Sequence, residues 1–175
     1  MSYTEIYAVT KKGNPIFIGE AKNSHLGAMW IWVKLFDKYI KNNEKKYFNN
    51  HWQEIWDLVK NNKLSIYEKI VLVSTFDQFI LLKEELDLFL KCLNKFNKSY
   101  LINDEDVLNP NLIEQEIILL NNKKFNKYIG FIWNQTSVNS DKKQAYNFEG
   151  EKNYYSIQDY LGKSLSELIK EFENE

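Results

Sequence analysis

Apolar side chains in residues 24–41 recur at helical spacing on two sides of a helix. The two stripes are Leu26, Met29, Val33, Phe36 and Ile40, and Ala28, Trp32, Leu35 and Tyr39. The remaining polar strip holds Lys34, Asp37, Lys38 and Lys41. A helix that is apolar around most of its circumference has to be covered on several sides. This pattern predicts the central helix of a single core, with Asn23 or Ser24 as its N-terminal cap.

The strand signals lie toward the two ends of the chain. Residues 4–10 and 15–21 are rich in β-branched and aromatic side chains and flank the turn sequence Lys-Lys-Gly-Asn. Such a pair of runs predicts an N-terminal β-hairpin. Residues 127–133 predict a further strand, and residues 144–148 and 153–157 predict a second hairpin.

Four further segments carry apolar stripes that predict helices. They are residues 51–60, 83–96, 110–121 and 164–172. The stripe of residues 110–121 that we expect to face inward is Leu112, Ile113, Ile117 and Leu120. Three of these helices lie between the N-terminal hairpin and the later strands, and the fourth follows the last strand.

Residues 65–82 carry conflicting signals. Ser65 and Glu68 have the spacing of a capping box, which favours a helix that starts at residue 66. Residues 79–82, however, are apolar and β-rich. We expect a helix to about Val73, then a turn, then a short extended segment that ends at Leu82.

Bunched helices between strands predict an α+β fold, not an alternating α/β fold. The antiparallel sheet is expected to combine the N-terminal hairpin with the C-terminal strands. It would pack on the central helix and on three to five further helices. No repeat or linker divides the sequence, so residues 1–175 are predicted to form one domain.

Composition supports a packed globular protein. Hydrophobic residues make up 44% of the chain and aromatic residues 15%. No apolar run reaches the length of about 20 residues that a membrane helix needs, and no N-terminal signal pattern is present. We therefore expect a soluble cytoplasmic protein without a membrane partner. The single cysteine, Cys92, is interpreted as a buried structural thiol.

Charge argues against direct nucleic-acid binding. The chain has 23 basic residues, all of them lysine, against 24 acidic residues, and its formal net charge is −1. Arginine is the residue that grips phosphates and guanine edges through two parallel hydrogen bonds. A chain without arginine and without a net basic charge lacks that footprint.

Catalytic, metal and cofactor motifs are missing from the sequence. His25 and His51 are the only histidines, and neither has partners at the spacing of a zinc site. We therefore expect no metal and no cofactor. The alternative is a small enzyme that acts on a nucleotide-type substrate, with Glu20, His25 and the strand end from Asn134 to Ser137 as its site.

Aromatic and acidic clusters provide the candidate binding residues. Trp30 continues the polar strip of the central helix beside Lys34, and exposed tryptophan is enriched at binding surfaces. Coverage of Trp30 by the loop of residues 41–50 is the competing interpretation. The other candidates are the tyrosines Tyr154, Tyr155 and Tyr160 and the acidic residues Asp104, Glu105 and Asp106.

Three segments together resemble small accessory proteins carried by phages and prophages of low-GC Gram-positive bacteria. They are residues 13–39 (GNPIFIGEAKNSHLGAMWIWVKLFDKY), 74–86 (STFDQFILLKEEL) and 129–137 (IGFIWNQTS). The resemblance implies a protein that binds and interferes with a host system such as restriction or CRISPR defence.

Three functional hypotheses follow. The first is a non-enzymatic binding protein whose partner is a host protein or a small ligand, and the second is the small enzyme. A structural or virion component is the third. The sequence does not indicate the oligomeric state.

Overall fold

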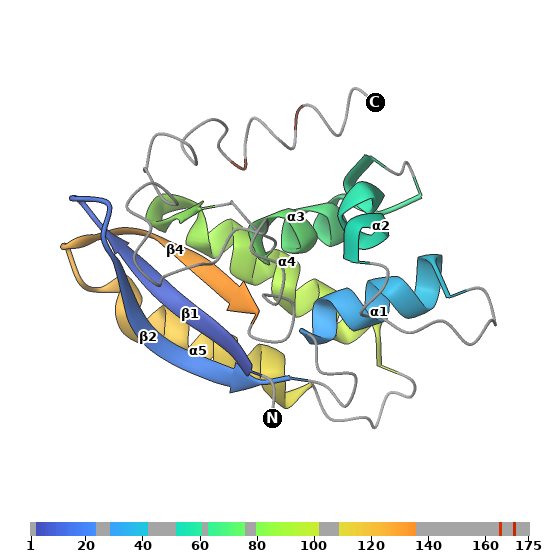
Figure 1. Ribbon diagram of the computed structural model, residues 1–175, viewed down its shortest axis with the longest axis horizontal. Helices are drawn as coiled ribbons and strands as arrows, with labels where there is room; N and C mark the ends of the chain where they lie inside the picture. Colours follow the sequence, from blue (N-terminus) through green and yellow to red (C-terminus); the bar gives the residue numbers. More distant parts are fainter. Residues whose placement is uncertain are drawn as a thin grey trace.

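A computed structural model describes residues 3–23, 29–41, 52–60, 63–75, 80–101 and 109–135, together with Leu165 and Lys170. The described part is an α+β fold with a four-stranded antiparallel sheet in the order β2-β1-β4-β3 (Figure 1). The strands are β1 (Tyr3–Thr10), β2 (Pro15–Lys22), β3 (Leu81–Leu82) and β4 (Tyr128–Gln135). The predicted fold class is confirmed.

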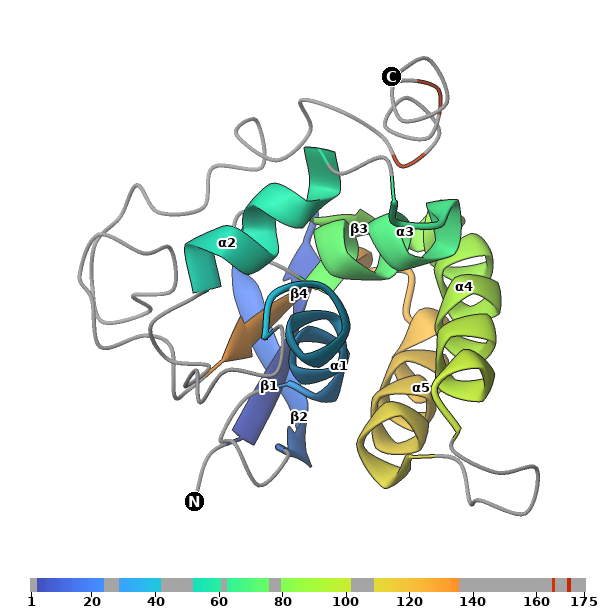
Figure 2. The ribbon, with the colours of Figure 1, turned by 90° about the vertical axis from the view of Figure 1, so that its right-hand side faces the viewer.

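Five α-helices lie between β2 and β4 in the described part of the chain. They are α1 (Trp30–Tyr39), α2 (Trp52–Asp57), α3 (Ile66–Thr75), α4 (Leu86–Ser99) and α5 (Pro110–Lys123). Two 3-10 turns, Leu58–Lys60 and Lys83–Glu85, follow α2 and precede α4. Figure 2 shows α1 end-on, with α4 and α5 side by side.

The N-terminal hairpin forms as predicted. Gly13 has a φ of 85°, a left-handed conformation that glycine adopts at little cost. Its N–H donates to the Thr10 carbonyl at 2.9 Å, while the Thr10 N–H donates to the Asn14 carbonyl at 3.0 Å. These bonds close the turn between β1 and β2.

The two faces of the sheet are buried differently. Ile6, Ala8, Phe131 and Trp133 share the main core cluster with the helices. Val9, Ile80 and Ile132 form a second, smaller cluster on the opposite face. The alternation along β1 and β4 therefore divides the apolar residues between the two faces, as period-two patterning requires.

Helix α1 is the buried central helix that its pattern predicts, but its expected start is wrong. Ile31, Trp32 and Leu35 are buried in the main cluster. Helix α1 nevertheless begins at Trp30, because Met29 has the extended angles φ −53° and ψ 135° and no side chain caps the helix. Asn23 accepts a hydrogen bond from the Thr4 hydroxyl at 2.5 Å instead of capping α1.

The ambiguous region resolves into a helix followed by a short strand. Helix α3 continues to Thr75, beyond the predicted Val73. Strand β3 pairs Leu81 and Leu82 with β4, which confirms the extended end of the segment. The second predicted hairpin lies outside the described residues, and of the last predicted helix only Leu165 and Lys170 are described, both in helical conformation.

Candidate binding surface

Helix α5 buries a different face from the one that its apolar stripe predicts. Gln115 is fully buried, whereas Ile117 is 52% and Leu120 47% exposed. The expectation that Ile117 and Leu120 face inward is therefore wrong. Leu112 and Leu119 are buried, and Ile113 is half-buried.

Hydrogen bonds explain why a glutamine occupies the inner face of α5. The Trp133 indole N–H donates to Gln115 Oε1 at 2.8 Å, and Gln115 Nε2 donates to Asn111 Oδ1 at 2.6 Å. Asn111 Nδ2 in turn donates to the Lys22 carbonyl at 2.7 Å. Buried polar groups are tolerated when they are paired in this way, and this chain ties α5 to β2 and β4.

The outer face of α5 consequently carries an apolar row. Ile113, Ile117 and Leu120 follow one another at spacings of four and three residues, so they lie on one side of the helix. That side is opposite to Gln115. Lys124 extends the same line at the C-terminal cap of α5.

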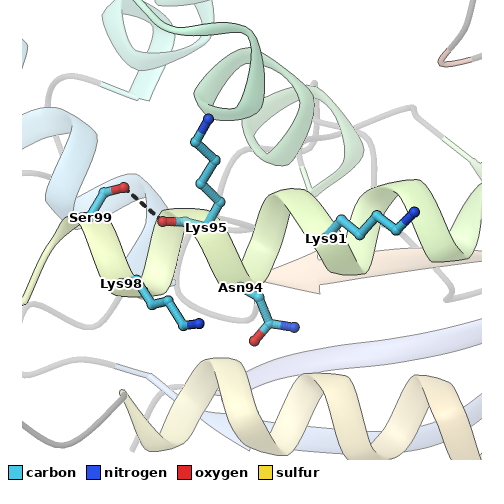
Figure 3. A pocket seen from close by; sticks show the side chains of 5 residues that line it. All are labelled: Lys91, Asn94, Lys95, Lys98 and Ser99. Carbon is cyan, nitrogen blue, oxygen red and sulfur yellow. Dashed lines mark hydrogen bonds between the residues drawn. The ribbon is translucent and has the colours of Figure 1, made fainter.

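A row of lysines lies on the outer face of the neighbouring helix. Lys91, Lys95 and Lys98 are all exposed and are spaced by four and three residues on α4. With Asn94 and Ser99 they line an open hollow of about 650 Å³ (Figure 3). Lys95 points toward α3, where its Nζ lies 4.7 Å from the centroid of the Tyr67 ring, while Lys98 and Asn94 point toward α5.

The two rows lie next to each other because α4 and α5 run antiparallel. Lys123 on α5 pairs with Asp87 on α4 at 2.5 Å, and Asn94 Nδ2 donates to Glu116 at 3.4 Å. This register places Lys91 level with Leu120 and Lys98 level with Ile113. We call five of these side chains the α4–α5 face: Lys91, Lys98, Ile113, Ile117 and Leu120. Lys95 of the same row is turned toward α3.

The predicted binding residue Trp30 is half-buried and not fully exposed. Its ring meets Phe96 and Tyr100 of the α4 end edge-on, with centroids 6.2 and 6.4 Å apart. Phe96 and Tyr100 therefore cover one side of Trp30. The competing interpretation, cover by the loop of residues 41–50, falls mostly on residues 42–50, which lie outside the described residues. Lys34 places its Nζ 5.1 Å from the Trp30 ring centroid.

A hollow of about 220 Å³ opens beside Trp30. Its lining comes from the end of β2, the start of α1 and the start of α5: Lys22, Asn23, Trp30, Asn109, Pro110, Asn111 and Glu114. Much of its polar lining holds the fold. Asn109 Oδ1 caps α5 by accepting from the Asn111 N–H at 2.9 Å, and Glu114 accepts from the Lys22 N–H at 3.3 Å.

The most densely bonded polar group of the described interior is the Glu68 carboxylate. It accepts hydrogen bonds from the Ser65 hydroxyl at 2.6 Å, the Tyr100 hydroxyl at 2.6 Å and Lys38 Nζ at 2.9 Å. The Ser65 N–H also donates to Glu68 at 2.8 Å, which is the bond that the glutamate makes in the predicted capping box. Both hydrogen bonds from Tyr39 measure 3.2 Å.

These partners decide the charge of Glu68. Burial alone raises the pKa of this carboxyl, but the hydrogen bonds from Ser65, Tyr100 and Lys38 outweigh it and lower the pKa to about 2. Burial and the same carboxylate raise the pKa of Tyr100. A carboxylate that is ionised and surrounded by donors stabilises the junction of α1, α3 and α4, and it has little basicity left for proton transfer.

The alternative catalytic residues are brought together only in part. Glu5 on β1 lies opposite Glu20 on β2 and opposite Asn134 on β4, so the three residues form one row across the sheet. Asn134 Nδ2 and the Tyr7 hydroxyl both donate to Glu5 Oε2, at 2.5 and 2.9 Å. Burial and Glu5 raise the pKa of Tyr7.

Several predicted residues lie outside the described part of the chain. They are His25, His51, Asp104, Glu105, Asp106, Ser137, Tyr154, Tyr155 and Tyr160. Cys92 is described, and it is buried as predicted. Burial raises the pKa of its thiol.

The described residues contain neither a group of metal-ligating side chains nor a membrane-spanning helix. Among these residues, no three or more His, Cys, Asp or Glu side chains are grouped so that they could hold a metal ion. Likewise, none of the described helices has the length and apolar character to cross a membrane.

Comparisons with known proteins identify no relative of this chain. No protein-family model, no curated protein and no solved structure matches the chain. The resemblance to phage and prophage accessory proteins therefore stays a prediction.

Proposed function

We propose that this protein is a non-enzymatic binding protein that docks a host protein on its α4–α5 face. The observation that carries the proposal is the exposed apolar row of α5, where Ile117 and Leu120 are 52% and 47% exposed. Single exposed apolar residues are ordinary, but a contiguous apolar surface bordered by charged residues is typical of an interaction site.

The helix itself supports this interpretation. Helix α5 is fixed by its cap at Asn109 and by the buried bonds of Asn111 and Gln115. Its outer residues are therefore presented on a fixed scaffold. A preformed surface loses less conformational entropy on binding than a flexible one.

The proposed setting is the cytoplasm of a bacterium that carries the gene on a phage or prophage. There the protein would cover a surface of a host factor, such as a component of CRISPR or of another defence. The predicted resemblance motivates this setting. The α4–α5 face supplies a physical means for it, because covering a protein surface needs shape and contact and no reacting group.

Capture from a host lysate tests the proposal when it is done with matched variants. The wild-type chain is compared with the double variant Ile117→Lys/Leu120→Lys. The control is Ile16→Lys/Phe17→Lys on β2, whose side chains are similarly exposed at 38% and 51%. We expect a partner, identified by mass spectrometry, that wild type and control retain and the α5 variant loses.

Thermal unfolding of all three proteins shows whether the substitutions leave the fold intact. A partner that the α5 variant retains at full strength contradicts the proposed surface. Failure of the wild-type chain to retain any protein contradicts the proposed function itself.

The hollow beside Trp30 favours a second candidate function, sequestration of a small ligand. It combines an aromatic wall with amide, carboxylate and lysine groups in about 220 Å³, which is a mixed lining suited to a small polar ring compound. Trp30→Phe and Trp30→Ala variants, titrated with nucleosides and sugars by calorimetry, test it. Binding that both variants retain equally would exclude the hollow.

A further inference from the structure

We infer that the partner presents an amphipathic helix with acidic residues along one flank, and that this helix lies along the α4–α5 face. The inference rests on the proposed function and names the class of partner for that surface. It follows from the two rows of the face, which differ in chemistry and run side by side.

The dimensions of the face match a helix. On each of α4 and α5 the first and last residues of the row are seven positions apart, a rise of roughly 10 Å or two helical turns. A partner helix that lies along these rows repeats its own side chains at the same spacing of three and four residues. Helices bound in this way anchor through such i, i+3/i+4 and i+7 positions.

The charge of the α4 lysines indicates that one flank of the partner helix is acidic. Within the described residues, Lys91 and Lys98 have no ion-pair partner, and Lys95 is placed over Tyr67. The neighbouring carboxylates Asp87 and Glu116 already have hydrogen-bond or ion-pair partners. Asp87 pairs with Lys123, and Glu116 accepts from Asn94 in the seam between the helices. The lysine row therefore presents positive charge that a row of Glu or Asp complements.

The apolar row excludes partners that are only charged. The apolar row of α5 lies beside the lysines. A phosphate backbone that bound the lysines would cover this row without offering it any apolar surface to pack against. Aliphatic side chains also lack the flat aromatic surface on which single-stranded bases stack. An acidic amphipathic helix satisfies both rows at once, because its leucines cover α5 while its carboxylates meet α4.

A set of short helical peptides tests the inference on the full chain. The test peptide has about 18 residues, leucines at i, i+4 and i+7 and glutamates along one flank. Three comparison probes are the same peptide with lysines for glutamates, the same peptide with serines for leucines, and a DNA duplex. Fluorescence anisotropy measures binding of each labelled probe.

We expect the acidic leucine peptide to bind most tightly of the four. Its affinity should fall at least about tenfold for Lys91→Gln/Lys98→Gln, and it should fall as salt rises. The control variant Lys11→Gln/Lys12→Gln, at the exposed hairpin turn, should bind like wild type. Equal binding of the lysine or serine peptide, or tighter binding of the DNA duplex, overturns the inference.

The two proposals can fail separately. If the α5 variant loses a lysate partner while the acidic peptide does not bind, the surface stands and the inferred partner class is wrong. If the acidic peptide binds equally to wild type and to the uncharged variant Ile117→Ser/Leu120→Ser, its binding site is elsewhere and the inference also fails. Absence of both the lysate partner and peptide binding overturns the two proposals together.

Discussion

At the residue scale, one carboxylate joins three helices. Glu68 belongs to α3, while its partners Lys38 and Tyr39 come from α1 and Tyr100 follows α4. Hydrogen bonds to a charged group are stronger than those between neutral groups, and removing the acceptor would leave several partly buried donors without this partner. The junction of these helices therefore depends on the ionised form of Glu68.

The first prediction is a pH-dependent effect of Glu68→Gln. The fall of the Glu68 pKa from 4.5 to about 2 corresponds to roughly 3 kcal/mol of stability. Because the folded pKa lies below the unfolded one, this contribution is fully present above about pH 4.5 and is lost as the pH falls toward 2. Urea unfolding should show a gap between wild type and variant at pH 7 that narrows below about pH 4.5.

The exposed Glu84 provides the control for this measurement. Glu84→Gln should leave the free energy of unfolding close to that of wild type across the same pH range. A gap between wild type and Glu68→Gln that stays constant from pH 7 to pH 3 would contradict the assigned role of the charge.

The role of Glu68 could be predicted from the sequence, whereas the role of Gln115 could not. Ser65 and Glu68 are three residues apart, so their capping box can be predicted from local spacing. Gln115 is paired with Trp133, which is distant in sequence and lies on another element. A local pattern cannot indicate such a bond, so the periodicity placed Ile117 and Leu120 inside and missed the face that they form.

At the scale of elements, patterning locates strands and helices better than it locates their ends. Met29 is fully buried, as its place in the apolar stripe predicts, yet its backbone is extended. Apolar residues that lead into a helix can fit helical spacing without being helical. The hydrogen bond from Thr4 to Asn23, which was a predicted cap residue, is a tertiary contact that no local signal reveals.

Two glycines show how closely elements approach each other. A Cβ at Gly130 of β4 would lie 2.6 Å from the Leu81 carbonyl oxygen and 2.8 Å from the Ile80 side chain. A Cβ at Gly19 of β2 would lie 2.9 Å from the Ile118 side chain of α5. The first obstacle is backbone of the paired strand β3, whereas the second is a side chain that can move.

The second prediction is that alanine is tolerated less well at Gly130 than at Gly19. Gly130→Ala should lower the free energy of unfolding by more than about 2 kcal/mol, because β3 must shift off β4. Gly19→Ala should cost about 1 kcal/mol, and adding Ile118→Val should recover part of that loss. Chemical denaturation gives the energies, and faster amide exchange at Leu81 and Leu82 identifies the damaged pair of strands.

Equal costs at the two glycines would contradict this account of the strand contact. It would also be contradicted if the double variant Gly19→Ala/Ile118→Val lost as much stability as the sum of the losses of the two single variants. The first result would contradict the difference between the two contacts, and the second would contradict the close approach of Gly19 to Ile118.

At the scale of the whole molecule, the core of the sheet and helices extends to a residue far along the chain. Leu165 is fully buried in the same main cluster as Trp32, Phe89 and Trp133. It lies 30 residues beyond the end of β4 at Gln135. Among the described residues, the burial of Leu165 is a contact between the C-terminal part of the chain and the core formed by the sheet and helices.

The third prediction concerns that contact. Leu165→Ala should lower the free energy of unfolding by roughly 2–5 kcal/mol, since it removes buried methyl groups from the core. Leu165→Met, which nearly keeps the volume, should cost less than about 1.5 kcal/mol. A chain that ends at Gln135 should lose at least as much stability as Leu165→Ala, because it removes the whole side chain together with its neighbours. Urea unfolding followed by tryptophan fluorescence measures all three, and a truncated chain as stable as wild type would show that the core closes without Leu165.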